Sequence, residues 1–184
     1  MEKSQERENI YLTPEIIKTI EKIGSIYSKY QNRAFDTAHQ LNASIDEYLK
    51  AHDLWENQSA IFNVIYSLPS IYPQYQLYDA LIAIRKKGEE IKVDLQENNL
   101  SPELLDEIKT MGRIYTENSE QAAKIENKLR KIINKYMTQH GLWKNQEAIR
   151  EVIECLPSGY LRFNFYETYY DLEKAKKAEI KEEN

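Results

Sequence analysis

Apolar residues recur along this chain at alternating spacings of three and four. One run extends over residues 16–48 and a second over residues 104–136. This spacing places the apolar side chains on one face of a helix. A hydroxyl residue followed by proline precedes each run, at residues 13–14 and 101–102, and this pair is typical of a helix start. We therefore predict two amphipathic helices of about 38 residues, each about 55–60 Å long at about 1.5 Å per residue.

The second half of the chain repeats the first at an offset of 88 residues. About 26 of about 81 aligned pairs are identical, where unrelated sequences would give about five. The segment His-x-Leu-Trp-x-Asn-Gln occurs at residues 52–58 and again at residues 140–146. The pattern predicts a tandem duplication. Its parts are a polar N-terminal tail at 1–11, repeat 1 at 12–98, repeat 2 at 99–180 and a charged tail at 181–184.

Each repeat is expected to contain a long, a short and a medium helix. The short helices are predicted at about residues 56–67 and 144–155, because a proline follows each and the residue before proline disfavours helix. In repeat 1 the third helix is predicted to be capped by Ser70, to include Pro73 in its first turn and to end near residue 96. The long helices are expected to stop where Asp or Gly can adopt the left-handed conformation.

These elements predict an all-α protein. A 38-residue amphipathic helix cannot bury its apolar face against a 12-residue helix alone, so it needs the third helix and the long helix of the other repeat. We therefore expect one elongated helical bundle with pseudo-two-fold symmetry, in which the two repeats share a core. Gly24 weakens the first long helix and is compatible with a close-packing contact.

The charge distribution narrows the partner class. The net charge is -5, and the basic clusters at residues 85–87 and 174–177 are accompanied by acidic residues. We interpret both clusters as solvated helix faces and expect no nucleic-acid partner. No apolar run approaches the roughly 18 residues of a membrane span, and the polar N-terminus is unlike a secretory signal. We expect a cytoplasmic protein, and homo-oligomers are compatible with the sequence. The single cysteine, Cys155, is interpreted as a small core residue.

The repeated His-x-Leu-Trp-x-Asn-Gln segment is the first candidate site. As a binding site, it would use tryptophan as an anchor and the amide side chains for hydrogen bonds. In a structural role, tryptophan would fix the corner between two helices, asparagine would cap the short helix and histidine would end the long one. We favour the structural role. The candidate residues are His52, Trp55, Asn57, His140, Trp143 and Asn145.

An aromatic stripe on the third helix is the second candidate site. Aromatic residues recur there every three residues, which places them near one helix face. Such a stripe could line a ligand cavity or a partner groove, but it is more often part of the core with hydroxyl groups at the rim. We interpret it as core. The candidate residues are Tyr72, Tyr75, Tyr78, Tyr160 and Tyr166.

Signatures of catalysis are absent from the sequence. It contains no glycine-rich phosphate loop, no Gly-x-Ser-x-Gly elbow and no pair of Glu-x-x-His motifs. We therefore assign no catalytic or metal-ligating residue and no cofactor. We predict a non-enzymatic helical protein-interaction module, such as an adaptor, an inhibitor or an immunity-type accessory protein, with a protein partner of unknown identity. The alternative is an enzyme or small-molecule-binding protein that uses a tyrosine-lined cavity between helices.

Overall fold

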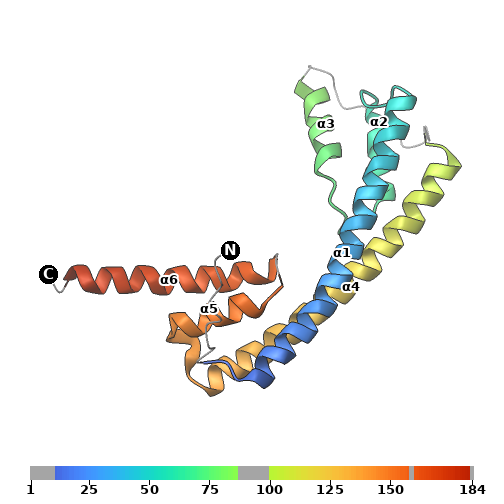
Figure 1. The fold of residues 1–184 in the computed structure, drawn as a ribbon. Coiled ribbons are helices and arrows are strands. Elements are labelled where there is room, and N and C mark those ends of the chain that lie inside the picture. The colour runs from blue at the N-terminus through green and yellow to red at the C-terminus, as the bar shows by residue number, and fades with distance from the viewer. Residues whose placement is uncertain (1–10, 87–99, 158–159, 183–184) are drawn as a thin grey trace, which may run out of the picture. The chain divides into compact units, whose positions relative to one another are not determined.

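The computed structural model of the protein describes residues 11–86, 100–157 and 160–182. All regular elements in these segments are helical, which confirms the predicted all-α class (Figure 1). In chain order they are α1 (Pro14–Ala51), α2 (Gln58–Ser67), α3 (Tyr75–Lys86), α4 (Pro102–Gln139), the 3-10 turn η1 (Leu142–Lys144), α5 (Gln146–Cys155) and α6 (Tyr160–Glu182).

Contacts within the chain define two compact units. Unit 2 comprises Tyr30–Gln121, and unit 1 comprises the residues before Tyr30 together with those after Gln121. Each unit therefore contains one part of α1 and one part of α4. Unit 2 also contains α2 and α3, whereas unit 1 contains η1, α5 and α6 (Figure 1). Both predicted repeats thus contribute segments to each unit.

The two long helices have 38 residues each, as predicted. Thr13 Oγ1 accepts a hydrogen bond from the Ile16 N–H at 3.5 Å. In the same way, Ser101 Oγ accepts one from the Leu104 N–H at 3.2 Å. Beyond the other ends, Asp53 has a φ of 54° and Gly141 a φ of 63°. This left-handed conformation ends a helix and confirms the predicted stop signals.

The short helices begin two residues later than predicted. Asn57 and Asn145 have extended backbone conformations and occupy the N-cap positions of α2 and α5. Asn57 Oδ1 accepts a hydrogen bond from the Ala60 N–H at 3.0 Å, and Asn145 Oδ1 accepts one from the Ala148 N–H at 3.1 Å. These bonds satisfy amide groups that a helix start leaves unpaired, so the asparagines define the boundary.

The predicted start of the third helix in repeat 1 is wrong. α3 begins at Tyr75, so neither Ser70 nor Pro73 belongs to it. Tyr72 lies before the helix in a turn, and its N–H donates to the carbonyl three residues earlier at 2.9 Å. Burial of the Tyr72 side chain holds this turn in place. The predicted continuation to residue 96 lies outside the described residues.

The core of unit 2 combines side chains from both predicted repeats. The start of α4 is attached to α1 by Tyr48, whose hydroxyl oxygen accepts a hydrogen bond from the Ser101 N–H at 2.9 Å. In unit 1, the Tyr136 hydroxyl oxygen accepts the corresponding bond from the Thr13 N–H at 3.2 Å. Central members of the unit 2 core are Leu41, Ile45, Leu49, Ile61, Val64, Leu104 and Ile108.

Each unit also contains a close contact between a glycine and a proline. A Cβ atom on Gly24 would lie 2.7 Å from Cδ of Pro157, and one on Gly112 would lie 2.9 Å from Cδ of Pro69. Distances below about 3 Å are strongly repulsive for carbon atoms, whose optimal separation is about 3.5–4.0 Å. Both glycines thus let the proline that ends a short helix pack directly on a long helix. The close packing expected of Gly24 is confirmed.

We predict that Gly24→Ala lowers the free energy of unfolding by about 1 kcal/mol. Alanine favours helix by about 1 kcal/mol over glycine, but overpacking a tight contact costs about 1–3 kcal/mol. Urea denaturation of Gly24→Ala, Pro157→Ala and the double variant measures the coupling. In the Pro157→Ala background, which lacks the proline ring, Gly24→Ala should no longer lower the free energy of unfolding. Strictly additive effects in the double variant would contradict the contact.

Candidate functional site

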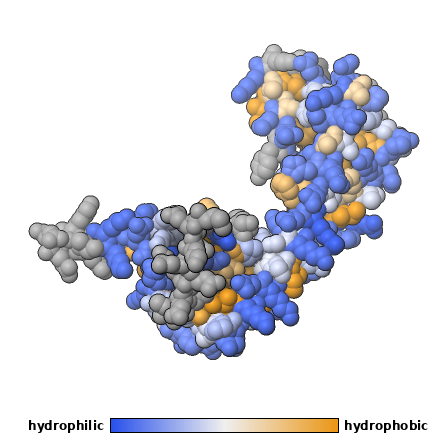
Figure 2. Space-filling model, viewed as in Figure 1, coloured by the Kyte–Doolittle hydropathy of each residue, from blue (hydrophilic) through white to orange (hydrophobic). Residues whose placement is uncertain are grey.

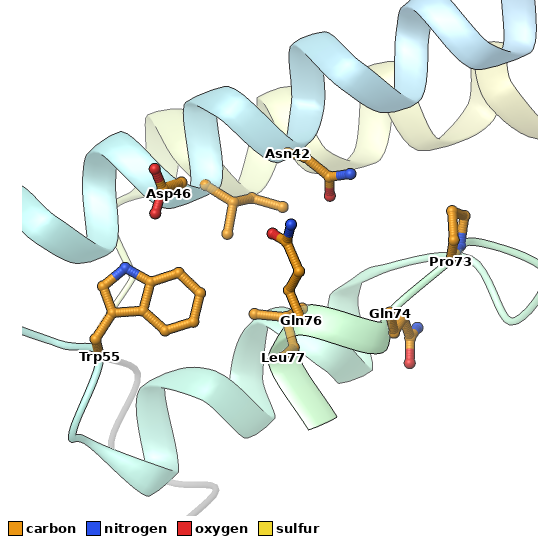
Figure 3. Close-up of a pocket in the computed structure, with 8 residues that line it drawn as sticks. Asn42, Asp46, Trp55, Pro73, Gln74, Gln76 and Leu77 are labelled. Carbon is orange, nitrogen blue, oxygen red and sulfur yellow. The ribbon is translucent and has the colours of Figure 1, made fainter. Parts of the chain in front are cut away.

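The Trp55 corner borders a cavity of about 210 Å³ in unit 2. Figure 3 shows Asn42 and Asp46 extending from α1, Trp55 at one end, and the amide of Gln76 reaching from α3 toward α1. Polar groups and an indole ring therefore face the same small volume. The residues that line the cavity are Asn42, Ile45, Asp46, Trp55, Pro73, Gln74, Gln76 and Leu77.

The Trp143 corner borders a cavity of about 310 Å³ in unit 1. Four of its lining positions lie 88 residues after lining positions of the Trp55 cavity. The side chains differ: Arg130 takes the position of Asn42, and Asn134 that of Asp46. The same corner thus has a cationic lining in unit 1 and an anionic one in unit 2. The lining residues are Asn127, Arg130, Lys131, Asn134, Trp143 and Phe165.

The two indole groups differ in their hydrogen bonds. Trp143 Nε1 donates to Thr138 Oγ1 at 3.2 Å, and its ring stacks on Phe165 with centroids 6.2 Å apart. Trp55 Nε1 is buried and has no hydrogen-bond partner among the described residues. The position that corresponds to Thr138 is Lys50, whose ammonium group cannot accept a hydrogen bond. Lys50 instead pairs with Asp46 at 2.7 Å.

The histidines and asparagines of the candidate segment lie away from both cavities. His52 and His140 are exposed, and their rings lie 4.4 Å from the rings of Tyr48 and Tyr136, respectively. The asparagines of the two segments cap α2 and α5. This placement agrees with the structural interpretation of the segment and leaves the tryptophans as its cavity-lining members.

A third hollow, of about 360 Å³, lies between α1 and α4 within unit 2. Its lining includes Tyr48, His52 and three glutamates. Two of the polar groups are already engaged, because Tyr48 accepts the Ser101 N–H and Glu107 accepts the Ser44 hydroxyl at 2.7 Å. The hollow therefore brings together one imidazole and several carboxylates. These glutamates are Glu47, Glu103 and Glu107.

The tyrosine candidates do not form one buried stripe. Tyr72 is buried, and its hydroxyl lies 2.8 Å from the Ala38 carbonyl oxygen, to which it donates, and 3.0 Å from Asn42 Oδ1. This burial raises the pKa of Tyr72 well above its ordinary value. Tyr78 and Tyr166 are exposed, so the core interpretation is wrong for both. The side chains of Tyr75 and Tyr160 lie outside the described residues.

Glu151 is a buried carboxylate that the sequence did not indicate. One of its oxygens, Oε2, accepts hydrogen bonds from the Leu12 N–H at 2.9 Å and the Tyr11 N–H at 3.1 Å. It thereby attaches the segment before α1 to α5. The corresponding residue in repeat 1 is Asn63, so the comparison of the repeats gave no identity at this position.

Cys155 is a poor nucleophile in this environment. Burial, followed by the charges of Glu21, Glu151 and Glu154, raises the pKa of its thiol to about 11. The thiol is therefore protonated at neutral pH, and the thiolate is the reactive form. Within the part of the chain that the structure describes, no three His, Cys, Asp or Glu side chains are grouped as a metal site requires.

Comparisons with known proteins add no assignment. No protein-family profile, no curated protein and no solved structure matches this chain. Among the described helices, none is both long and apolar enough to cross a bilayer.

We predict that adding an acceptor for the Trp55 indole N–H stabilises the protein, whereas removing the acceptor of the Trp143 indole N–H destabilises it. Lys50→Thr supplies the missing acceptor for Trp55 and should raise the free energy of unfolding by about 0.5–1 kcal/mol. Loss of the exposed Lys50–Asp46 pair offsets this by at most about 0.5 kcal/mol. Thr138→Ala should lower stability by about 0.5–1 kcal/mol, because Trp143 loses its acceptor. Urea denaturation gives both values. A Lys50→Thr variant that is less stable than the wild-type protein would contradict the conclusion that the buried Trp55 N–H lacks an acceptor.

Proposed function

We propose that the chain is a non-enzymatic protein-interaction module, built as a tandem duplication of a three-helix unit. The duplication is supported by contacts at positions 88 residues apart. The bonds of Tyr48 and Tyr136 to the starts of the long helices correspond, and so do the two glycine–proline contacts. The interaction role is supported by the outward faces of the third helices.

An exposed aromatic face on α6 is the observation that carries this proposal. Phe163, Tyr166 and Tyr170 are 57%, 39% and 52% exposed. Their spacing of three and four residues places them on one face of the helix. Phe165 is buried and stacks on Trp143, so it anchors α6 to its own unit. α6 therefore uses different faces for folding and for solvent exposure, and exposed apolar faces of helices are common docking elements.

α3 has the same arrangement in unit 2. Tyr78 and Ile82 are 48% and 51% exposed and correspond to Tyr166 and Tyr170 of α6. Leu77 and Leu81 are buried and attach the opposite face of α3 to the core. Figure 2 shows hydrophobic surface, in orange, over α3. Both third helices thus present apolar side chains to solvent in the same register.

Ligand binding or catalysis in the hollow beside His52 is a second candidate function. It is favoured by the imidazole and the three carboxylates that line this hollow. Its volume of about 360 Å³ lies near the lower end of the about 300–1,000 Å³ of typical ligand pockets. The existing bonds of Tyr48 and Glu107 leave fewer free groups for a ligand, so we rank this function below protein interaction.

We predict that Phe163→Ser/Tyr166→Ser/Tyr170→Ser removes partner binding without unfolding the protein. These side chains lie on the solvent-facing side of α6 and are 39–57% exposed, so the free energy of unfolding should fall by only about 1 kcal/mol. The measurement is affinity purification from the native host with quantitative mass spectrometry. A stoichiometric partner should be recovered with the wild-type protein and lost with the variant.

The matched control replaces three exposed polar residues of the same helix, Glu167, Lys174 and Lys176, with serine. This control should retain the partner. Recovery of the same partner by the aromatic variant would contradict the proposal. Absence of any stoichiometric partner with the wild-type protein would contradict it as well.

A further inference from the structure

Four lysines form an exposed stripe on the second part of α4. Lys124, Lys128, Lys131 and Lys135 are spaced by four, three and four residues and therefore share one helix face. No ion pair joins any of them to another residue that the structure describes. Like charges at this spacing destabilise a helix by about 0.2–0.5 kcal/mol per pair. The stripe thus concentrates positive charge at some expense of stability.

The lysine stripe reaches the Trp143 cavity, because Lys131 belongs to both. Arg130 also lines the cavity, but its guanidinium binds Glu126 at 2.6 Å. The cavity therefore offers the Lys131 ammonium group, the amides of two asparagines, and the apolar rings of Trp143 and Phe165. This combination suits a ligand that carries both negative charge and an apolar group.

The corresponding face of α1 has the opposite character. Asp36, Gln40, Ala43 and Glu47 stand 88 residues before the four lysines. By sequence, the residues of unit 1 include 17 basic and 15 acidic ones, whereas those of unit 2 include 8 basic and 15 acidic ones. The net charges are therefore +2 and -7. The lysines are a property of unit 1 and are not required by the helical framework that both units use.

We propose that the lysine stripe and the Trp143 cavity bind an acidic segment of a protein partner. Its carboxylates lie along the stripe, and an apolar side chain or backbone contacts Trp143. This proposal rests on the proposed interaction function and names the chemistry of the partner. Along the helix, Lys124 and Lys135 are about 16 Å apart at about 1.5 Å per residue. An extended peptide covers this length with about five residues.

A protein ligand fits this surface better than a nucleic acid. α6, which also belongs to unit 1, carries five acidic and five basic residues, so this helix adds no net positive charge to that of the stripe. A phosphate backbone that continued past the stripe would gain no further attraction from α6. Trp143 already stacks on Phe165 and donates its N–H to Thr138, which limits its use as a platform for bases.

The test titrates the ¹⁵N-labelled full-length protein with a capped hexaglutamate peptide at low ionic strength. The two tryptophan indole N–H signals in an NMR spectrum report on the two corners separately. The Trp143 signal should shift to saturation while the Trp55 signal stays in place. Added salt should weaken binding. Lys128→Glu/Lys131→Glu should weaken it about tenfold, since each exposed charge pair contributes up to about 1 kcal/mol.

The matched control is Lys174→Glu/Lys176→Glu, which makes the same charge change at exposed positions on α6. It should weaken binding less than Lys128→Glu/Lys131→Glu does, because neither lysine belongs to the stripe or lines the Trp143 cavity. The proposal is overturned if hexaglutamate causes no shift of Trp143, or if hexaglutamine shifts it equally. Tighter binding of a thymidine hexanucleotide at the same ionic strength would overturn it in favour of nucleic acid.

The outcomes for the two proposals can be separated. If hexaglutamate causes no shift of the Trp143 signal but the α6 aromatic variant loses the partner, only the acidic-ligand proposal is contradicted. If the aromatic variant retains its partner, the proposed docking role of α6 fails, whatever the peptide titration gives.

Discussion

The structure depends on the packing of each long helix against segments from the other half of the chain. An amphipathic helix of 38 residues exposes its whole apolar face unless partners cover it, and a helix of 10 residues cannot do so alone. In unit 2, the start of α4 supplies the missing surface, with Ile108 buried in the core and Gly112 in contact with Pro69. Tyr48 fixes the register by holding the Ser101 N–H.

The buried positions of the two units correspond, whereas their exposed charges differ. Leu41 and Leu129, 88 residues apart, are both fully buried, whereas the exposed face nearby changes from Glu47 to Lys135. Substitutions on the exposed face change the surface potential with little effect on the core. The units therefore combine the same internal framework with opposite charges. If both units serve recognition, as we propose, their opposite charges suit partners of different charge, which is the property expected of an adaptor.

Local signals in the sequence predicted most of the fold, and long-range contacts explain what it missed. The ends of the long helices were predictable because hydroxyl caps, Asp53 and Gly141 act on their own backbone neighbourhood. Pro73 was misplaced because the turn before α3 depends on Tyr72, whose hydroxyl donates to Ala38, 34 residues away. The role of Glu151 was also missed, because its backbone donors lie about 140 residues away in sequence. The lysine stripe was detectable only by helical spacing, since acidic and neutral residues separate its members in the linear sequence.

Cleavage of the folded chain between α3 and α4 shows whether each half of the chain folds only in contact with the other. A protease site is inserted between Lys92 and Val93, in the sequence that connects α3 to α4. Both fragments should remain together in gel filtration at micromolar concentration. They should separate only in denaturant, in the same transition in which the helical circular dichroism signal is lost, because each core requires segments from both halves. Fragments that elute separately, each helical and each with its own cooperative unfolding transition, would contradict the account.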